Sequence, residues 1–164
     1  MLKIRRYQPE DNEVVKELHY AGIAQMREIT QAVLRSEVRQ FIDSDLDDIE
    51  GVYINNKGDF LVGLQDGEIV AMGAFKQRTP ECAEFKRLRI RPDCQRKGYG
   101  EAMMRKLMEL AAEMGYKEGF LDTLITNFRA QRLFEKCGWV KSGGGKTGPF
   151  ELLFYSRKLN KGGN

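Results

Sequence analysis

The sequence predicts a mixed fold of the α+β class. Its centre would be a mixed, mostly antiparallel sheet of about seven strands, with about four helices on both faces. Three observations predict it. Alternating segments and segments with helical spacing follow one another in the order β-α-α-β-β-β-α-β-α-β-β. An Asp-Gly pair at 66–67 between two apolar runs is a strong hairpin signal. A helix joins the strand ending at Ile90 to the strand near Leu121, which predicts a parallel pair with a right-handed crossover.

The composition is typical of one globular domain that spans residues 1–164. With 164 residues, 41% of them hydrophobic and 31% charged, the chain can bury a core without metals or disulfides. No apolar run approaches the roughly 20 residues needed to span a bilayer. The N-terminal segment turns charged at once and has no signal-peptide core. We therefore expect a cytoplasmic protein that does not bind membranes.

Cysteine, histidine and net charge argue against several kinds of site. Three widely spaced cysteines, an odd number, predict reduced thiols: Cys82, Cys94 and Cys137. The single histidine, His19, and the lack of paired cysteines argue against a bound metal. A net charge of +3 without long basic blocks is too small to favour nucleic acid as a partner.

The first quarter of the chain predicts a strand and two helices. Residues 2–7 alternate in polarity and end before Pro9, as a strand would. Apolar residues then recur at helical spacing over residues 10–26, and again over residues 38–53. A turn follows, because the next segment reads Asn-Asn-Lys-Gly-Asp.

Three strands come next. Residues 60–65 and 68–77 form the two arms of the Asp-Gly hairpin. The third strand, 82–90, stops before Pro92, which cannot continue the ladder. The apolar positions of this strand change parity in its middle, from Ala83 and Phe85 to Leu88 and Ile90. One extra residue, a β-bulge, explains the change, and so does a strand covered on both faces.

The C-terminal half alternates helices and strands. A methionine-rich apolar stripe over residues 98–115 predicts a helix. Residues 117–124 predict a strand, and residues 126–137 predict a helix capped by Asn127 or the preceding threonine. Residues 139–159 predict two strands around a glycine-rich loop.

Three ligand-binding motifs are matched only in part and are therefore excluded. The segment Gly-Gly-Gly-Lys-Thr-Gly lacks the first glycine of a triphosphate loop, since position 140 is Val. A dinucleotide fingerprint would need glycine at position 103, which is Met. A calcium loop starting at residue 43 would need Gly at its sixth position, which is Asp. An acidic helix face explains this stretch better, although acids near a substrate mouth would also attract amines: Asp43, Asp45, Asp47 and Asp48.

The segment from Gln95 to Gly100 lies between a predicted strand end and a predicted helix start. The N–H groups of a first helical turn lack intrahelical partners and, with the helix dipole, favour an anion. Gly98 and Gly100 let a phosphate approach the backbone, and Arg96 and Lys97 add positive charge. On spacing alone, a phosphate site and a plain strand-to-helix turn stay equally open.

The same segment resembles the acetyl-CoA pyrophosphate loop of the GNAT superfamily of N-acetyltransferases. The signature of that loop is Gln or Arg, two residues, Gly, one residue, and Gly or Ala, which Gln95, Gly98 and Gly100 match. Residues 83–92 resemble the family's fourth strand. Residues 121–139 resemble its fifth strand and fourth helix, with matches at Asn127, Ala130, Leu133, Gly138 and Trp139. The resemblance covers essentially the whole chain and implies the GNAT acyltransferase fold.

The resemblance also implies acetyl-CoA as the acyl donor, held in a gap between the fourth and fifth strands, with no metal. Backbone groups of Leu88 and Ile90 would orient the pantetheine arm and the thioester. The pyrophosphate would lie on the loop formed by Gln95, Arg96, Lys97, Gly98, Tyr99 and Gly100. Asn127 would contact the CoA arm or only cap its helix, and Phe134 would pack against that arm.

The implied reaction is direct attack of a primary amine on the thioester, the amine belonging to a small molecule, amino acid, peptide or protein. An alkylamine with a pKa of about 10.4 is mostly protonated at neutral pH, so a general base must remove a proton. Glu84 matches a glutamate that many members carry, and Asp122 is a second candidate. An ion pair between Glu84 and Lys86 is an equally weighted alternative. A homodimer is left open.

One position departs from the family pattern. Phe134 occupies the place where many members have a tyrosine that protonates the departing thiolate. Either another group, such as Tyr99 or Tyr155, supplies the proton, or the thiol leaves without help. The departure motivates an alternative function, a catalytically weak domain that binds or senses acyl-CoA.

Overall fold

The computed structural model describes residues 1–26 and 44–161, and a seven-stranded sheet runs through them in the order β1-β2-β3-β4-β5-β7-β6. Neighbouring strands are antiparallel except for β4 and β5, which are parallel. The predicted mixed, mostly antiparallel sheet is therefore confirmed. The strands are β1 (Lys3–Arg6), β2 (Asp59–Gln65), β3 (Glu68–Thr79), β4 (Cys82–Ile90), β5 (Glu118–Leu124), β6 (Val140–Thr147) and β7 (Phe150–Lys158).

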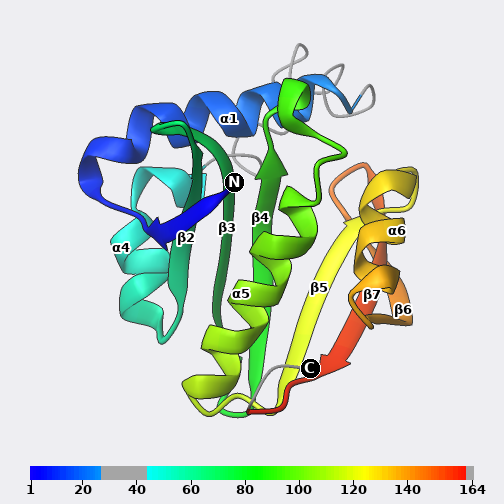
Figure 1. Cartoon of the computed structure of the whole chain (residues 1–164). Coiled ribbons are helices and arrows are strands. Elements are labelled where there is room, and N and C mark those ends of the chain that lie inside the picture. The colour runs from blue at the N-terminus through cyan, green and yellow to red at the C-terminus, as the bar shows by residue number, and fades with distance from the viewer. Residues whose placement is uncertain (27–43, 162–164) are drawn as a thin grey trace.

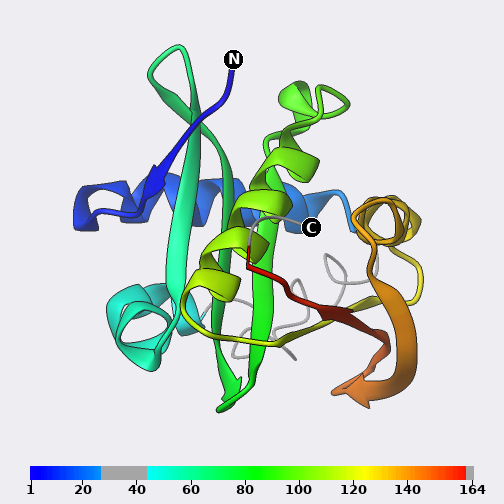
Figure 2. The same cartoon turned by 60° about the horizontal axis from the view of Figure 1, so that its bottom comes forward.

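Helices cover both faces of the sheet (Figures 1 and 2). The α-helices are α1 (Asn12–Ala24), α4 (Ile49–Val52), α5 (Tyr99–Glu113) and α6 (Phe128–Lys136). Short 3-10 turns lie at η1 (Pro9–Asp11), η2 (Ser44–Asp47), η3 (Ile54–Asn56) and η4 (Pro92–Cys94).

The two faces of the sheet bury different clusters of apolar side chains. On one face α5 and α6 pack against the sheet through a cluster that includes Phe75, Leu107 and Phe134. On the other face α1 and α4 pack through a second cluster that includes Val15 and Phe60. Each helix contributes one apolar stripe, as expected of helices that pack on a sheet.

The prediction of a second helix over residues 38–53 is wrong for the residues that the structure describes. Residues 44–56 form three short helical turns instead of one helix. The break falls at Asp48, whose backbone is not helical (φ −144°, ψ 67°) and whose side chain accepts a hydrogen bond from the N–H of Gly51 at 3.0 Å. An Asp that caps a new helix in this way ends the one before it. The residues before Ser44 in that prediction lie outside the described part.

The β-bulge predicted in the third strand is confirmed. Ala74 of β3 pairs with Lys86 of β4, and Met72 pairs with Arg89, so β4 carries one residue more than β3 between these pairs. Arg87 absorbs the extra residue with a positive φ of 63°. The bulge lets Leu88 and Ile90 pack with the same core cluster as Phe85.

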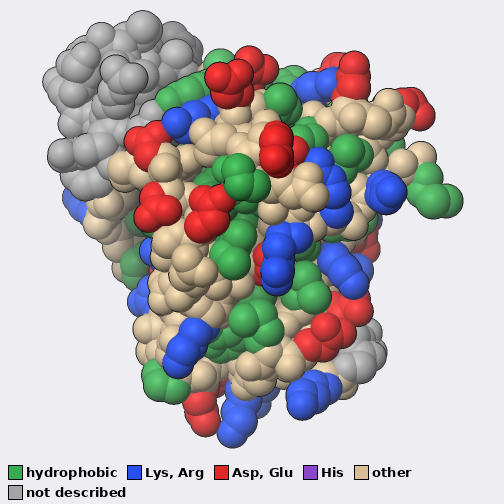
Figure 3. Space-filling view, turned by 90° about the vertical axis from the view of Figure 1, so that its left-hand side faces the viewer, with side chains coloured by type: hydrophobic (Ala, Val, Ile, Leu, Met, Phe, Trp, Pro, Cys, Tyr) green, Lys and Arg blue, Asp and Glu red, His purple; other side chains and the backbone are tan. Residues whose placement is uncertain are grey.

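The face that carries β1 and α4 mixes charges of both signs (Figure 3). Charges of β1 and α1 form ion pairs: Arg5 contacts Asp11 at 2.7 Å, Arg6 contacts Asp59 at 2.8 Å, and Lys16 contacts Asp47 at 2.6 Å. On this face, the described side chains form no large patch of a single charge sign.

Candidate functional site

A cleft opens where β4 and β5 part. The two strands pair at only three positions, the last of which joins Glu84 to Phe120, and then diverge (Figure 1). Beyond this point lies an open cavity of about 770 Å³ between the ends of β4 and β5, α6 and the end of α1. Because β4 has no strand partner on this side after Glu84, backbone polar groups there can bind a ligand. The bulge at Arg87 bends β4 in this same stretch.

The cavity brings together most of the predicted site residues. Those that line it are Leu88, Ile90, Gln95, Arg96, Gly98, Tyr99, Gly100, Asp122, Asn127 and Phe134. Glu84 and Lys97 do not line it. Lys97 is exposed on the loop, and Glu84 lies at the point where the strands part.

The glycine loop ends in an unusual backbone that aims N–H groups at one place. Arg96 and Gly98 both have positive φ, 65° and 81°, and α5 begins directly after them. In the described part of the chain, no hydrogen bond uses the N–H groups of residues 96–101 as donors. Alternating backbone conformations of this kind form an anion-binding nest, and the dipole of a 15-residue helix adds to it. This backbone geometry is suited to bind an anion.

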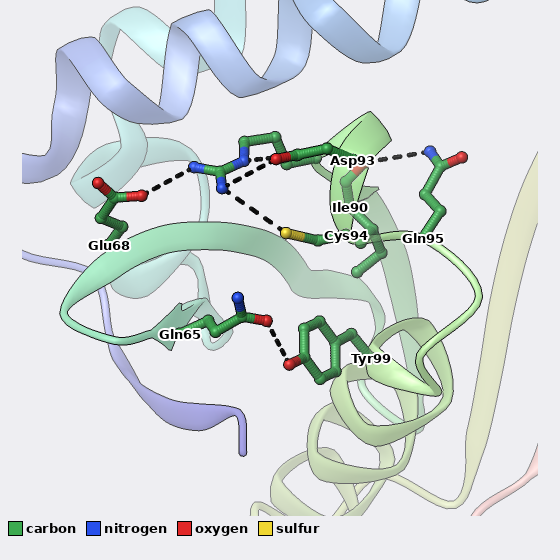
Figure 4. A network of polar contacts seen from close by, with 8 residues as sticks. Gln65, Glu68, Ile90, Asp93, Cys94, Gln95 and Tyr99 are labelled. Carbon is green, nitrogen blue, oxygen red and sulfur yellow. Dashed lines mark hydrogen bonds and ion pairs between the residues drawn. The ribbon is translucent and has the colours of Figure 1, made fainter.

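The side chains of Gln95 and Tyr99 hold the loop in place (Figure 4). The amide of Gln95 donates to the carbonyl oxygen of Ile90 at 3.2 Å and to Gln25, directly after α1, at 3.0 Å, and its oxygen accepts from Arg129 of α6. The hydroxyl of Tyr99 donates to Gln65 at 2.5 Å. These contacts fix the loop to four elements, so its N–H groups are preorganised.

The two tyrosines considered as proton donors differ: the hydroxyl of Tyr99 has a hydrogen-bond partner, whereas the buried hydroxyl of Tyr155 has none. The Tyr99 hydroxyl points toward Gln65 (Figure 4). Tyr155 is fully buried beside Phe134, with their ring centroids 5.8 Å apart, and burial raises the pKa of its hydroxyl. Phe134 is 7% exposed, belongs to the core cluster and also lines the cavity. Asn127 caps α6 by accepting a hydrogen bond from the N–H of Ala130 at 3.2 Å.

Two carboxylates lie on one face of the sheet beside the parting strands. Glu84 pairs with Phe120 in register, and Asp122 follows two residues later on the same face of β5. Asp122 reaches solvent through the cavity, yet the surrounding walls remove enough water to raise the pKa of its carboxyl, and the nearby Glu84 adds to the rise. Glu84 is 17% exposed, with its carboxylate 4.0 Å from the ammonium of Lys86.

A buried ion pair ties η2 to the bulge of β4. Arg87 donates two hydrogen bonds to the carboxylate of Asp45, at 2.8 and 2.6 Å, and Tyr53 donates a third. The other described aspartates of this stretch are also engaged, Asp47 with Lys16 and Asp48 as a helix cap. These three carboxylates therefore have partners within the chain, and Asp43 lies outside the described residues.

Removing this ion pair should destabilise the fold. The side chains of Arg87 and Asp45 are only 13% and 16% exposed, so Asp45→Asn leaves a buried cation without its partner. We expect a loss of about 3 kcal/mol or more in the free energy of unfolding, measured by urea denaturation at neutral pH. A Lys117→Gln control breaks the exposed pair with Glu81 and should cost less than about 1 kcal/mol.

The same pair predicts how stability depends on pH. Burial alone would raise the pKa of Asp45, but the hydrogen bonds and charge of Arg87 outweigh it, so the pKa lies below its ordinary value. A lowered pKa gives stability that is present above the unfolded value of about 3.9 and is lost as the pH falls below it. Unfolding free energies measured down to pH 3 should fall less steeply in Asp45→Asn than in the parent protein. Equal slopes would contradict this linkage.

Arg87 and Arg89 belong to a cluster of six basic residues between positions 86 and 97, which the sequence indicates to be mostly a solvated surface or else a positive rim around a phosphate ligand. Both line the cavity. The signal was present but ambiguous: after the bulge, β4 places Arg89 on the face opposite the apolar Leu88 and Ile90. A basic residue between two apolar strand positions is usually solvated, so the sequence assigned Arg89 no role of its own.

The described residues contain neither a group of metal ligands nor a helix that could span a membrane. Within residues 1–26 and 44–161, no three His, Cys, Asp or Glu side chains are grouped so that they could hold a metal ion. Over the same residues, no helix has the length and apolar character needed to cross a membrane.

Comparison with known proteins relates this chain to acetyltransferases. Residues 23–139 match the model of the acetyltransferase (GNAT) family. N-acetylaspartate synthetase of Danio rerio is 26% identical over 136 residues, which cover 77% of this chain and 48% of that protein. The chain spans about half the length of the curated relatives it matches.

Solved structures share the fold at low sequence identity. A GNAT-family acetyltransferase from Staphylococcus aureus Mu50 superposes with a TM-score of 0.79 at 17% identity, covering 98% of this chain and 100% of that one. The Salmonella typhimurium protein yncA, solved with its cofactor acetyl-CoA, gives a TM-score of 0.73 at 19% identity, covering 97% and 94%.

Proposed function

The chain belongs to the acetyltransferase (GNAT) family and is an acyltransferase, and we propose that it transfers the acetyl group of acetyl-CoA to a primary amine. The acceptor is a small molecule, amino acid, peptide or protein. One observation carries the proposal: the cavity between the diverging strands β4 and β5 ends at a loop whose N–H groups 96–101 have no partner in the described chain. A long thioester with a pyrophosphate at one end suits such a site.

Two sets of backbone groups would hold the donor. The N–H groups from Arg96 to Gly100 bind the pyrophosphate, with the helix dipole of α5 adding positive potential. The backbone of Leu88 and Ile90 binds the pantetheine arm, which takes the place of the missing strand partner beyond Glu84. Asn127 and Phe134 line the opposite wall and contact the same arm.

The carboxylate pair of Glu84 and Asp122 supplies the general base. Acetyl-CoA brings a thioester whose carbonyl carbon the neutral amine attacks; a C–N bond forms, the C–S bond breaks, and CoA leaves as a thiol. A carboxylate of the pair takes the proton that the protonated amine must lose. Asp122 lines the cavity and has a raised pKa, which brings its basicity closer to neutral pH, so we assign it the direct contact. Glu84 acts on Asp122 through its charge.

The departing thiolate needs no tyrosine in this scheme. Phe134 has no proton to give, the hydroxyl of Tyr99 is bonded to Gln65, and Tyr155 does not line the cavity. A thiol with a pKa of about 8.5 is a good leaving group near neutral pH. Asp122 passes the proton of the ammonium form to solvent, and the second proton, which the nitrogen loses as the amide forms, reaches the thiolate through water.

The proposal is tested by measuring free thiol released from acetyl-CoA in the presence of a panel of primary amines. We expect at least one amine to raise the rate well above hydrolysis, with saturation in both substrates. If acetyl-CoA binds but no amine raises the rate, the chain is a binding or sensing domain and the enzymatic proposal is wrong. Hydroxyl analogues of the best amines are the control, and they should give only the hydrolytic rate.

A further inference from the structure

Arg89 lies on the cavity wall, and no acidic side chain of the described residues forms an ion pair with it. One guanidinium nitrogen, Nη1, donates to the carbonyl oxygen of Leu88 at 3.1 Å, whereas Nε is buried and has no hydrogen-bond partner. Of the other partly buried arginines in the described chain, Arg5, Arg87 and Arg91 each face a carboxylate, and Arg157 donates to two carbonyl oxygens. A buried charge left unpaired is costly, and such a charge on a cavity wall points to an anion that arrives with a ligand.

The fold makes room for this side chain. Arg89 lies against Gly22 of α1, where an added Cβ would stand 2.6 Å from the Cδ atom of Arg89. A helix interior normally disfavours glycine, so the glycine here gives space at some cost in helix stability. Gly22 and Arg89 both line the cavity, and the glycine therefore opens it to the guanidinium.

Within the described residues, the charges next to Arg89 on β4 are paired and Arg89 is not. Arg87 is neutralised by Asp45, and Lys86 lies 4.0 Å from Glu84. Burial, with Arg87 nearby, lowers the pKa of Arg89 to about 10. The guanidinium of Arg89 therefore stays protonated at neutral pH despite its burial. Arg89 and Asp122 both lie on the sheet face covered by α1, Arg89 in register with Met72 of the α1 core cluster.

We propose that Arg89 binds a carboxylate of the acceptor, so that the preferred acceptor is an amino acid, a small molecule that carries both an amine and a carboxylate. A planar guanidinium with free N–H groups suits bidentate binding of a carboxylate. The contact holds the acceptor on the α1 side of the sheet, from which Asp122 takes the amine proton. This inference rests on the proposed acetyl transfer and adds the substrate class.

The test compares matched acceptors and one substituted residue. Thiol release is measured with amino acids, with their primary amides and with the corresponding decarboxylated amines. The parent protein should prefer the acid over the amide by about 10- to 100-fold in kcat/KM, the range expected of a hydrogen-bonded charge. Arg89→Met should erase this preference by raising KM for the acid alone, and Arg89→Lys should restore part of it.

Two further measurements separate this role from others. Thermal unfolding of Arg89→Met should occur at or above the parent temperature, because the change removes an unpaired buried charge. Its affinity for acetyl-CoA should be unchanged. A weaker affinity for acetyl-CoA would instead place Arg89 on the donor and overturn the proposal. Equal use of acid and amide by the parent protein, or an equal loss with every acceptor, would overturn it as well.

A failure of the proposed function can be told apart from a failure of this inference. If no amine releases thiol, acetyl transfer is wrong, and Arg89 is then tested by calorimetric titration of amino acids into the protein saturated with CoA. Binding that needs the carboxylate and is lost in Arg89→Met supports the carboxylate site. Absence of binding, or binding that the variant retains, rejects it.

Discussion

Gly98→Glu lowers the affinity for acetyl-CoA by about 10- to 100-fold, whereas Gly67→Glu leaves it unchanged. The new carboxylate at position 98 lies beside the free N–H groups 96–101 and competes with the pyrophosphate for them. Charge-assisted hydrogen bonds and the helix dipole together account for an effect of this size. The affinity is measured by calorimetric titration of acetyl-CoA.

Gly67 is a close control for this substitution. Both glycines have a φ of 81°, and an added Cβ would meet nothing within 4 Å at either position. The two variants therefore carry similar backbone strain, and they differ in whether the new charge lies on the loop or in the β2–β3 turn. Equal losses of affinity in both variants would mean that strain, and not the anion site, explains the result. An unchanged affinity in Gly98→Glu would mean that the loop does not hold the donor.

Asp122→Asn should lower kcat by about 100-fold or more while the affinity for acetyl-CoA stays the same. The amide keeps the shape of the carboxylate but cannot accept the proton of the attacking amine, and general base catalysis contributes at least this factor. Glu84→Gln should have a smaller effect, because Glu84 does not line the cavity. Steady-state rates of thiol release with a saturating amine give kcat for each variant.

The pH profile identifies which carboxylate acts. Burial raises the pKa of Asp122, and the neighbouring Glu84 raises it further. A base works only when deprotonated, so the parent rate should rise with pH through this raised pKa, and Glu84→Gln should move the rise to lower pH. Asp122→Asn should lose this limb of the profile. If Glu84→Gln has the larger effect on kcat and abolishes the limb, Glu84 is the direct base instead.

Most of the fold could be predicted from local patterns in the sequence. The parity change between Phe85 and Leu88 indicated a bulge, and the structure has one at Arg87. The Asp-Gly pair at 66–67 forms the β2–β3 turn, and α5 starts at the predicted glycine loop. These features depend on residues close together in the chain, where backbone preference and side-chain alternation act directly.

The parts that sequence reasoning missed depend on distant residues. Arg87 and Asp45 lie 42 positions apart, and Tyr99 and Gln65 lie 34 apart, so neither pair leaves a local signal. The break at Asp48 was hidden because Leu46, Ile49 and Tyr53 are buried whether they belong to one helix or to three short turns. The spacing of apolar residues indicates which side chains face the core, but it indicates less well the position at which a helix is interrupted.

The central claim is that the loop before α5 and the gap between β4 and β5 bind acetyl-CoA. It is tested most directly by titrating acetyl-CoA into the ¹⁵N-labelled protein and following the amide resonances. The largest shifts should occur at residues 96–101, where N–H groups gain a partner, and next at residues 88–90 of β4. Saturable binding that leaves the amides of residues 96–101 unshifted would contradict the claim.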